Sequence, residues 1–132
     1  MNSKLKQNSV GIVKPETIEI NETLRLDCGK LLDSFELIYE TYGSLNSEKS
    51  NAILVFHALT GDQFATDINP ITKKDGWWKY ALGAGKAIDT NKFFVICANV
   101  LGGCMGSFGP SSINPKTKKT YGNDFPVITI ND

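Results

Sequence analysis

Residues 51–61 read NAILVFHALTG, an apolar run of strand length that ends in a short turn containing Thr60 and Gly61. The run from Ile53 to Phe56 shows no alternation of apolar and polar residues, which favours a strand buried on both faces of a parallel sheet. Open α/β sheets bind ligands beyond the carboxyl ends of such strands. The turn is therefore the first candidate site, because a turn of this kind can aim a backbone N–H at a developing negative charge.

The size and charge of the chain exclude several classes of protein. Its 132 residues are enough for one domain but not for two of ordinary size. The 14 basic residues balance the 14 acidic residues, so the net charge gives no support for a nucleic-acid partner or an acidic membrane surface. No apolar run approaches the ~18 residues that cross a bilayer, and the first residues lack the apolar core of a secretory signal. We therefore predict a cytoplasmic protein without a nucleic-acid or membrane partner.

The cysteines and the histidine give no indication of a metal site. Cys28, Cys97 and Cys104 are odd in number and irregularly spaced, which is typical of reduced thiols and not of a disulfide framework or a zinc site. His57 is the only histidine, so the chain cannot supply several histidines to one metal ion. We predict that no metal is bound.

The first third of the chain predicts an arm and a hairpin. Residues 1–14 look like a flexible amino-terminal arm. Alternating apolar residues predict a strand over Thr17–Leu26, interrupted by a turn at Asn21-Glu22, and a second strand over Leu32–Tyr42. In this second strand, the alternation places Phe35, Leu37 and Tyr39 on one face, which is expected to be the apolar face. The segment Cys28-Gly29-Lys30 supplies a turn between the two strands, so an antiparallel hairpin is expected.

The remainder predicts one more buried strand among long loops. Gly61–Asp75 is expected to be a loop, and Trp77–Leu82 one or two turns of helix. Phe93–Val100 is a second apolar run and a second buried strand. Gly102–Gly122 is rich in glycine, proline and serine, which indicates a long loop. Asn131-Asp132 looks like a helix N-cap, so the chain reads as the amino-terminal part of a longer α/β unit.

Three segments resemble the amino-terminal portion of the homoserine O-acetyltransferases, which are α/β-hydrolase-fold enzymes of methionine biosynthesis. They are NAILVFHALTGD, GWWKYALGAGKAIDTNKFFVICANVLGGCMGSFGPSSINP and YGNDFPVITIND. The resemblance covers residues 15–132. It implies the amino-terminal part of an α/β-hydrolase domain, with an antiparallel opening hairpin followed by parallel strands, truncated before the nucleophile elbow.

The resemblance also implies a reaction. In the family, a serine takes the acetyl group from acetyl-CoA, and the hydroxyl of L-homoserine then attacks the acyl-serine. That serine lies in a G-x-S-x-G elbow after the next strand, with Asp and His further on, and none of the three is in this chain. The resemblance therefore implies a homodimeric acyltransferase that uses acetyl-CoA as co-substrate and no other cofactor. The 132 residues alone are predicted to be inactive.

One catalytic element carries over from the family. The HALTG turn matches the family's first oxyanion-hole segment, so the backbone N–H of Leu59 is expected to be one oxyanion donor, with Thr60 and Gly61 close to substrate. The chain departs from the family where Gln63 and Phe64 follow HALTGD, and at Phe108, where the family often has Thr. Because of these departures, the choice between acetyl and succinyl as the acyl group stays open, as does the choice between homoserine and serine as the acceptor.

Rival interpretations remain beside this one. Gly102–Gly106 spells G-x-C-x-G around Cys104, but the Gly and Pro that follow argue against the helix that a nucleophile elbow needs, so we expect a glycine-rich loop with a buried thiol. His57 is expected to be a packed or site-lining residue. The chain could also be a non-catalytic module whose sheet edge pairs with a partner strand, or an α/β-hydrolase-fold enzyme with another substrate.

Overall fold

The structure is a computed structural model that describes residues 14–132. The expected arm at residues 1–14 lies outside this range except for Lys14. The described chain divides into two compact units. Of the described residues, the first contains 14–16 and 39–98, and the second contains 17–38 and 99–132.

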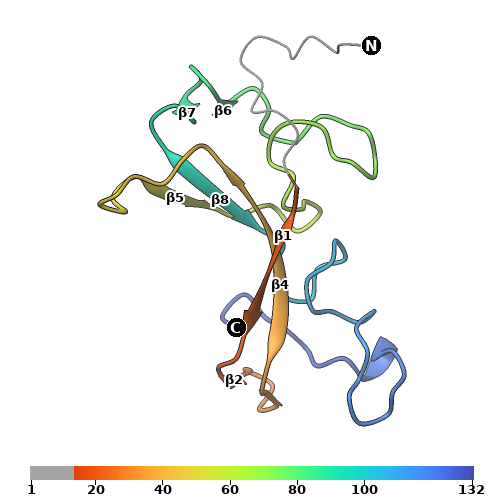
Figure 1. Cartoon of the computed structure of the whole chain (residues 1–132). Coiled ribbons are helices and arrows are strands. Elements are labelled where there is room, and N and C mark those ends of the chain that lie inside the picture. Colours follow the sequence, from red (N-terminus) through yellow and green to blue (C-terminus); the bar gives the residue numbers. More distant parts are fainter. Residues whose placement is uncertain (1–13) are drawn as a thin grey trace. The chain divides into compact units, whose positions relative to one another are not determined.

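A mixed sheet organises the first unit. Its strands are β5 (Ala52–Val55), β8 (Phe94–Ala98) and the second half of β4 (Phe35–Tyr42). The order of strands in the sheet is β1-β4-β8-β5, where β1 is Glu16–Ile20. Strand β8 pairs in parallel with β5 and antiparallel with β4, and Figure 1 shows β5 and β8 side by side. The two short strands β6 (Leu82–Gly83) and β7 (Ile88–Asp89) form a separate parallel pair. The predicted mixture of antiparallel and parallel strands is confirmed.

The core of the first unit lies on one face of β5. The buried residues are Tyr42, Val55, Ala65, Leu82, Val95 and Cys97, with Ile53 and Ile88 packed against them. Val55 is 6% exposed, whereas its neighbour Leu54 is 56% exposed. The expectation that Ile53–Phe56 is buried on both faces is therefore wrong in this structure. Residues 14–132 contain no α-helix to cover the second face, and Phe56 lies beyond the end of the strand.

The second unit contains the predicted hairpin. Strand β1 (Glu16–Ile20) is followed by β2 (Leu24–Arg25), which pairs antiparallel with β3 (Leu31–Leu32). The turn between β2 and β3 depends on Gly29, whose φ of 82° is a left-handed conformation that favours glycine. The turn at Cys28–Lys30 is thus confirmed. The expected strand over Thr17–Leu26 is broken as predicted.

A small core and an aromatic cluster hold the second unit together. Leu26, Leu32 and Phe35 are buried, and their partly buried neighbours are Ile20, Leu24, Leu37, Leu101, Phe108 and Ile128. The ring of Phe108 lies 5.5 Å from that of Tyr121 and 5.4 Å from that of Phe125. The long segment after Gly102 is a loop, as expected, and it contains only the 3-10 helix η1 (Gly122–Asp124).

Strand β4 contributes to both cores, and this changes its buried face. In its first half Phe35 is buried, but in its second half the buried residues are Glu40 and Tyr42, which have the opposite parity. The expected apolar face on the parity of Phe35 therefore holds only for the first half. Each half of the strand packs against a different core, so a single alternation cannot describe it.

Two local predictions are corrected. The segment Trp77–Leu82 forms hydrogen-bonded turns and no assigned helix: Leu82 N–H donates to the Trp78 carbonyl at 3.0 Å, and the chain then enters β6. At the other end, no helix follows the N-cap expected at Asn131-Asp132 within the described residues, and the segment forms a turn. Thr129 N–H donates to Asp132 Oδ2 at 2.6 Å, and Thr129 Oγ1 accepts from Asn131 N–H at 3.2 Å.

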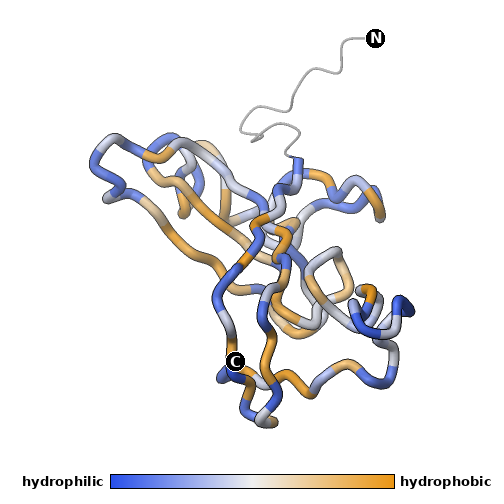
Figure 2. Tube along the Cα trace, turned by 60° about the horizontal axis from the view of Figure 1, so that its bottom comes forward, coloured by the Kyte–Doolittle hydropathy of each residue, from blue (hydrophilic) through white to orange (hydrophobic). Residues whose placement is uncertain are grey.

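Hydrophobic segments in the described chain stay short. Figure 2 shows them interrupted by hydrophilic residues along the trace. In residues 14–132 we find no helix with the length and apolar character required to span a bilayer.

Candidate active-site segment

The HALTG segment forms a tight hydrogen-bonded turn directly after β5. Gly61 N–H donates to the Ala58 carbonyl at 2.7 Å, which closes a turn with Leu59 and Thr60 at its centre. The first central N–H of such a turn makes no bond within the turn. Within the part of the chain that the structure describes, the Leu59 N–H donates to no acceptor, and the Leu59 side chain is fully exposed. This N–H is therefore available to a ligand.

Close packing explains the glycine that ends the turn. A Cβ at position 61 would lie 2.9 Å from the His57 Cβ and 3.1 Å from the Ala58 carbonyl oxygen. Any larger residue would push the turn away from His57. Gly61 thus has a steric role in shaping the turn, and its expected proximity to substrate, like that of Thr60, stays a prediction.

His57 is half-buried at the end of the strand. Its Nδ1 lies 2.8 Å from the Ala58 carbonyl oxygen, and since a carbonyl only accepts, Nδ1 carries the proton of this bond. This contact orients the imidazole against its own turn. His57 is consistent with the expected packed or site-lining residue.

Cys104 does not lie in a nucleophile elbow. Gly102 N–H donates to the Phe108 carbonyl at 2.8 Å, so the segment folds back on itself, and no helix follows. The predicted glycine-rich loop is confirmed. The expected burial of the thiol is wrong, because Cys104 is exposed, as is Cys28. The loop's bonds are made by its backbone, which leaves the side chain outside.

A buried polar cluster lies behind the turn in the same unit, and sequence reasoning missed it. The Tyr42 hydroxyl lies 2.6 Å from Glu40 Oε2 and 3.1 Å from the Gln63 carbonyl oxygen, and it accepts from the Ala65 N–H at 3.1 Å. Tyr42 and Gln63 are 1% exposed and Glu40 is 2% exposed. The sequence offered one signal of this cluster: Glu40 and Tyr42 are two residues apart in a strand and so lie on the same face of it.

Burial raises the pKa values of several ionisable groups in this cluster. Desolvation is the main cause that raises the pKa of Glu40 to about 7. The hydrogen bond with Tyr42 lowers this pKa, and the negative charges of Asp62 and Asp67 raise it further. Burial also raises the pKa of Tyr42 above its ordinary value and the pKa of the Cys97 thiol to about 12. The pKa of Asp67 is raised, chiefly by burial. A cluster of raised pKa values beside a candidate site is typical of functional regions.

Asp62 fixes the loop that follows the turn. Its carboxylate accepts from Phe64 N–H at 2.9 Å and from Asn69 Nδ2 at 3.1 Å, and its carbonyl accepts from Trp77 Nε1 at 3.0 Å. The last residue of the HALTGD motif is thus a structural anchor. It ties the turn to the loop up to Trp77.

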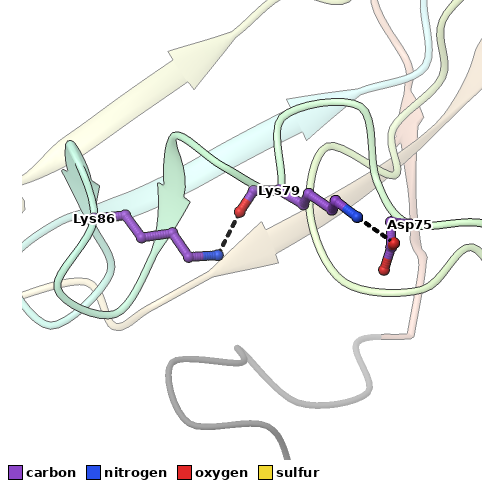
Figure 3. A network of polar contacts seen from close by, with 3 residues as sticks. All are labelled: Asp75, Lys79 and Lys86. Atoms are coloured by element: carbon purple, nitrogen blue, oxygen red, sulfur yellow. Dashed lines mark hydrogen bonds and ion pairs between the residues drawn. The ribbon is translucent and has the colours of Figure 1, made fainter.

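A second polar network fastens the turns that follow this loop. Figure 3 shows Lys79 paired with Asp75, while Lys86 donates to the Lys79 carbonyl. Lys86 also donates to the Leu82 carbonyl at 3.2 Å. These bonds satisfy carbonyls that a continuing helix would otherwise use.

Of the residues that depart from the family, Gln63 and Phe64 are buried and Phe108 is partly buried. Gln63 is buried and Phe64 is 3% exposed, so neither side chain faces outward from the turn. Phe108 packs on Tyr121 and Phe125. Any effect of these three on substrate selectivity would act through packing. Across residues 14–132, no group of three or more His, Cys, Asp or Glu side chains could hold a metal ion.

Comparisons with known proteins identify the relatives of this segment. No protein-family model matches the chain. A homoserine O-acetyltransferase of Pelagibacter ubique is 68% identical over 120 residues, which cover 91% of this chain and 32% of that protein. The chain is a homologue of the homoserine O-acyltransferases. The family resemblance expected from the sequence is therefore confirmed.

Other members of this group carry either acyl name. A homoserine O-acetyltransferase of Methanobrevibacter ruminantium is 59% identical over 97% of this chain and 26% of its own length. A homoserine O-succinyltransferase of Halothiobacillus neapolitanus is 56% identical over 94% of the chain and 31% of its own length. The chain thus spans about a third of the length of the curated relatives it matches.

Solved structures confirm the predicted fold. The homoserine O-acetyltransferase of Bacillus anthracis superposes with a TM-score of 0.79 at 39% identity, over 89% of this chain and 33% of that one. Esterase E22 superposes with a TM-score of 0.78 at 36% identity, over 91% of this chain and 34% of that one. Residues 14–132 of this chain therefore form part of an α/β-hydrolase fold.

Proposed function

We propose that the complete protein containing this segment transfers an acyl group from acyl-CoA to the side-chain hydroxyl of L-homoserine. The observation that supports this most strongly is the 68% identity to a homoserine O-acetyltransferase over 91% of the chain. The exposed Leu59 N–H, which donates to no acceptor in the described residues, adds the group that acyl transfer needs.

The proposed reaction has two half-reactions. A serine outside these 132 residues attacks the thioester carbonyl, the C–S bond breaks, and CoA leaves with a proton as its thiol. The homoserine hydroxyl then attacks the acyl-serine and gives up its proton, and the serine leaves as the ester product forms. In each tetrahedral intermediate the oxygen that gains charge would accept a hydrogen bond from Leu59 N–H.

The acyl group is proposed to be acetyl, with succinyl as the alternative. Both names occur among the relatives: two of those with high identity are homoserine O-acetyltransferases and others are homoserine O-succinyltransferases. The buried positions of Gln63 and Phe64 favour an indirect influence of these residues on the choice. Serine is the alternative acceptor.

A steady-state assay of the full-length enzyme tests the proposal. Release of CoA is followed with acetyl-CoA or succinyl-CoA as donor and homoserine or serine as acceptor. We expect parallel double-reciprocal lines, which are typical of a ping-pong mechanism, and the highest kcat/KM with acetyl-CoA and homoserine. No acceptor-dependent CoA release with either donor would overturn the proposal.

Ester hydrolysis is the second candidate function. The superposition on esterase E22 supports it, because the same fold there acts in a protein named as an esterase. Water would then replace homoserine in the second half-reaction. Turnover of a simple acetyl ester in the absence of any hydroxyl acceptor, faster than transfer to homoserine, would favour this function.

The setting of the enzyme is proposed as well. We propose a cytoplasmic homodimer, supported by the free cysteines Cys28, Cys97 and Cys104 and by the family resemblance. Residues 15–132 are proposed to be the amino-terminal part of its α/β-hydrolase domain and to be inactive alone, because the catalytic serine, aspartate and histidine of the family are elsewhere. A defined complex with an unrelated polypeptide would instead favour a non-catalytic module.

A further inference from the structure

The loop that follows the HALTG turn folds back on itself between residues 65 and 78. Near its open end, Trp78 N–H donates to the Ala65 carbonyl at 2.6 Å, and near its tip, Asn69 N–H donates to the Lys74 carbonyl at 2.9 Å. Backbone bonds therefore join its two limbs at both ends, and the 65–78 loop has a defined shape.

The buried Asn69 fixes the tip of this loop. Its Oδ1 accepts from Ile71 N–H at 2.9 Å and from Thr72 N–H at 3.0 Å, and its carbonyl accepts from Lys73 N–H at 2.9 Å. Only backbone groups of Lys73 and Lys74 take part in these bonds. Both side chains are exposed, and within residues 14–132 neither ammonium group forms an ion pair.

The two tip lysines differ in this respect from the other lysines nearby. Lys79 is paired with Asp75, and Lys86 donates to the Lys79 carbonyl (Figure 3). Those two cations hold the fold of the segment. Lys73 and Lys74 are adjacent in the chain and make no such contact in the described residues, so their charges can serve an anionic ligand.

Two tryptophans lie where the second limb of the loop ends. The ring centroids of Trp77 and Trp78 are 5.3 Å apart, and the side chains are 38% and 40% exposed. Trp77 Nε1 donates to the Asp62 carbonyl at 3.0 Å, which fixes its ring. Partly exposed aromatic faces of this kind bind nucleotide bases by stacking, with little regard to which base it is.

Asp62 connects these groups to the candidate oxyanion donor. Besides its carbonyl bond with Trp77, its carboxylate accepts from Asn69 Nδ2 at 3.1 Å. Leu59 is three residues before Asp62, and Trp77 is three residues after Lys74. Three residues of chain span at most about 11 Å. The lysines, the rings and the Leu59 N–H are therefore within the reach of one elongated substrate.

We propose that the 65–78 loop binds the nucleotide end of acyl-CoA. This end carries a pyrophosphate, a 3′-phosphate and an adenine ring, and a long pantetheine arm joins it to the thioester. Lys73 and Lys74 pair with the phosphates, and the adenine stacks on Trp78. The inference rests on the proposed function, because the Leu59 N–H is proposed to meet the carbonyl of the same thioester.

A comparison of two acyl donors in the full-length enzyme tests the role of the lysines. Acetyl-CoA carries the nucleotide, whereas S-acetyl-pantetheine has the same thioester and arm without it. We expect the wild type to have a much higher kcat/KM with acetyl-CoA. The double variant Lys73→Gln/Lys74→Gln should reduce this preference about tenfold or more, because two charged contacts with phosphate are lost. An unchanged preference would overturn the proposal.

Lys92→Gln is the matched control for the loss of charge. Lys92 is exposed and precedes β8, which runs parallel to β5. The HALTG turn follows the other end of β5, so Lys92 lies at the opposite edge of the sheet. We expect its preference for acetyl-CoA to equal that of the wild type.

Calorimetry provides a readout besides activity, with adenosine 3′,5′-bisphosphate as the probe. We expect saturable binding to the full-length wild type that weakens as the salt concentration rises, and binding at least tenfold weaker in the double lysine variant. Trp78→Leu should also bind more weakly, whereas Trp78→Phe keeps an aromatic face and should bind more tightly than Trp78→Leu. Equal affinities of the wild type and the double lysine variant would overturn the proposal.

Other outcomes separate this proposal from the proposed function. If the lysine and tryptophan variants lower the Tm of the full-length enzyme but change neither donor preference nor bisphosphate binding, the loop is covered by protein and the nucleotide site is wrong. If the wild type transfers no acyl group to any acceptor but binds the bisphosphate through Lys73 and Lys74, the proposed function is wrong and the nucleotide site stands without it.

Discussion

Gly61 packs so closely against His57 that a methyl group at position 61 would lie 2.9 Å from the His57 Cβ. The imidazole in turn lies against the Ala58 carbonyl, with Nδ1 2.8 Å from its oxygen. The first and last residues of the HALTG motif, His57 and Gly61, therefore pack directly against each other.

Replacement of Gly61 by alanine should distort this turn. The added Cβ forces His57 or the backbone to move, and overpacking of this kind costs about 1–3 kcal/mol. We expect a lower free energy of unfolding in urea and a lower kcat of the full-length enzyme. The matched control is Thr60→Ala, an exposed neighbour in the turn, for which we expect a change within about 0.5 kcal/mol. Equal effects of the two variants would contradict the packing argument.

Leu59→Pro should abolish the proposed oxyanion donor without unfolding the turn. The N–H that it removes donates to no acceptor in the described residues, and proline suits the first central position of a turn. We expect turnover to fall ~10²–10³-fold. Leu59→Ala keeps the N–H and loses only an exposed side chain, so its kcat should stay close to the wild-type value. If both substitutions had the same effect on kcat, the backbone role would be wrong.

The stability of the protein should depend on pH through Glu40. Its pKa is raised from 4.5 in the unfolded chain to about 7 in the folded chain, so the folded state binds the proton more tightly. This contribution to stability is fully present below 4.5 and is lost as the pH rises through about 7. The shift corresponds to about 3 kcal/mol.

The measurement is the free energy of unfolding in urea across this pH range. We expect the wild type to lose stability relative to Glu40→Gln as the pH rises, because the amide does not titrate. A constant difference between the two proteins at all pH values would contradict this expectation, because it would show that the pKa of Glu40 is the same in the folded and the unfolded chain.

The isolated 132-residue chain should be poorly soluble or marginally stable. Strand β5 is at the edge of the sheet order, and its Leu54 is 56% exposed, with Phe56 beyond it 77% exposed. Unpaired apolar edges are sites of aggregation. We expect aggregation in light scattering, reduced in Leu54→Lys. A sharp, cooperative melt of a monomer would contradict this expectation.

The three cysteines should react with a thiol reagent in two phases. Cys28 and Cys104 are exposed, whereas Cys97 is buried and its pKa is raised to about 12. Because the thiolate is the reactive form, Cys97 should react slowly in the native protein. We expect two thiols to be titrated quickly and the third only after unfolding in urea. Cys97→Ala should remove the slow phase alone.

The sequence alone determined several local conformations of this protein, although not the turns of Trp77–Leu82, for which it predicted a helix. A glycine at position 29 between two alternating runs predicted the hairpin turn, and the apolar runs around Val55 and Val95 predicted two strands, which the structure shows as the parallel neighbours β5 and β8. The same holds for the HALTG turn, because glycine and small residues limit the backbone to few conformations. The family resemblance also came from the sequence, through long segments in the right order.

The tertiary structure decided which side chains are buried and what they meet. The alternation in β4 predicted one apolar face, but its two halves pack against different cores, and this buries Glu40 beside Tyr42. The contact of Tyr42 with the Gln63 carbonyl joins residues 21 positions apart, which no local pattern contains. Local sequence limits the backbone, whereas the burial and protonation of a polar group depend on neighbours that only the folded chain brings together.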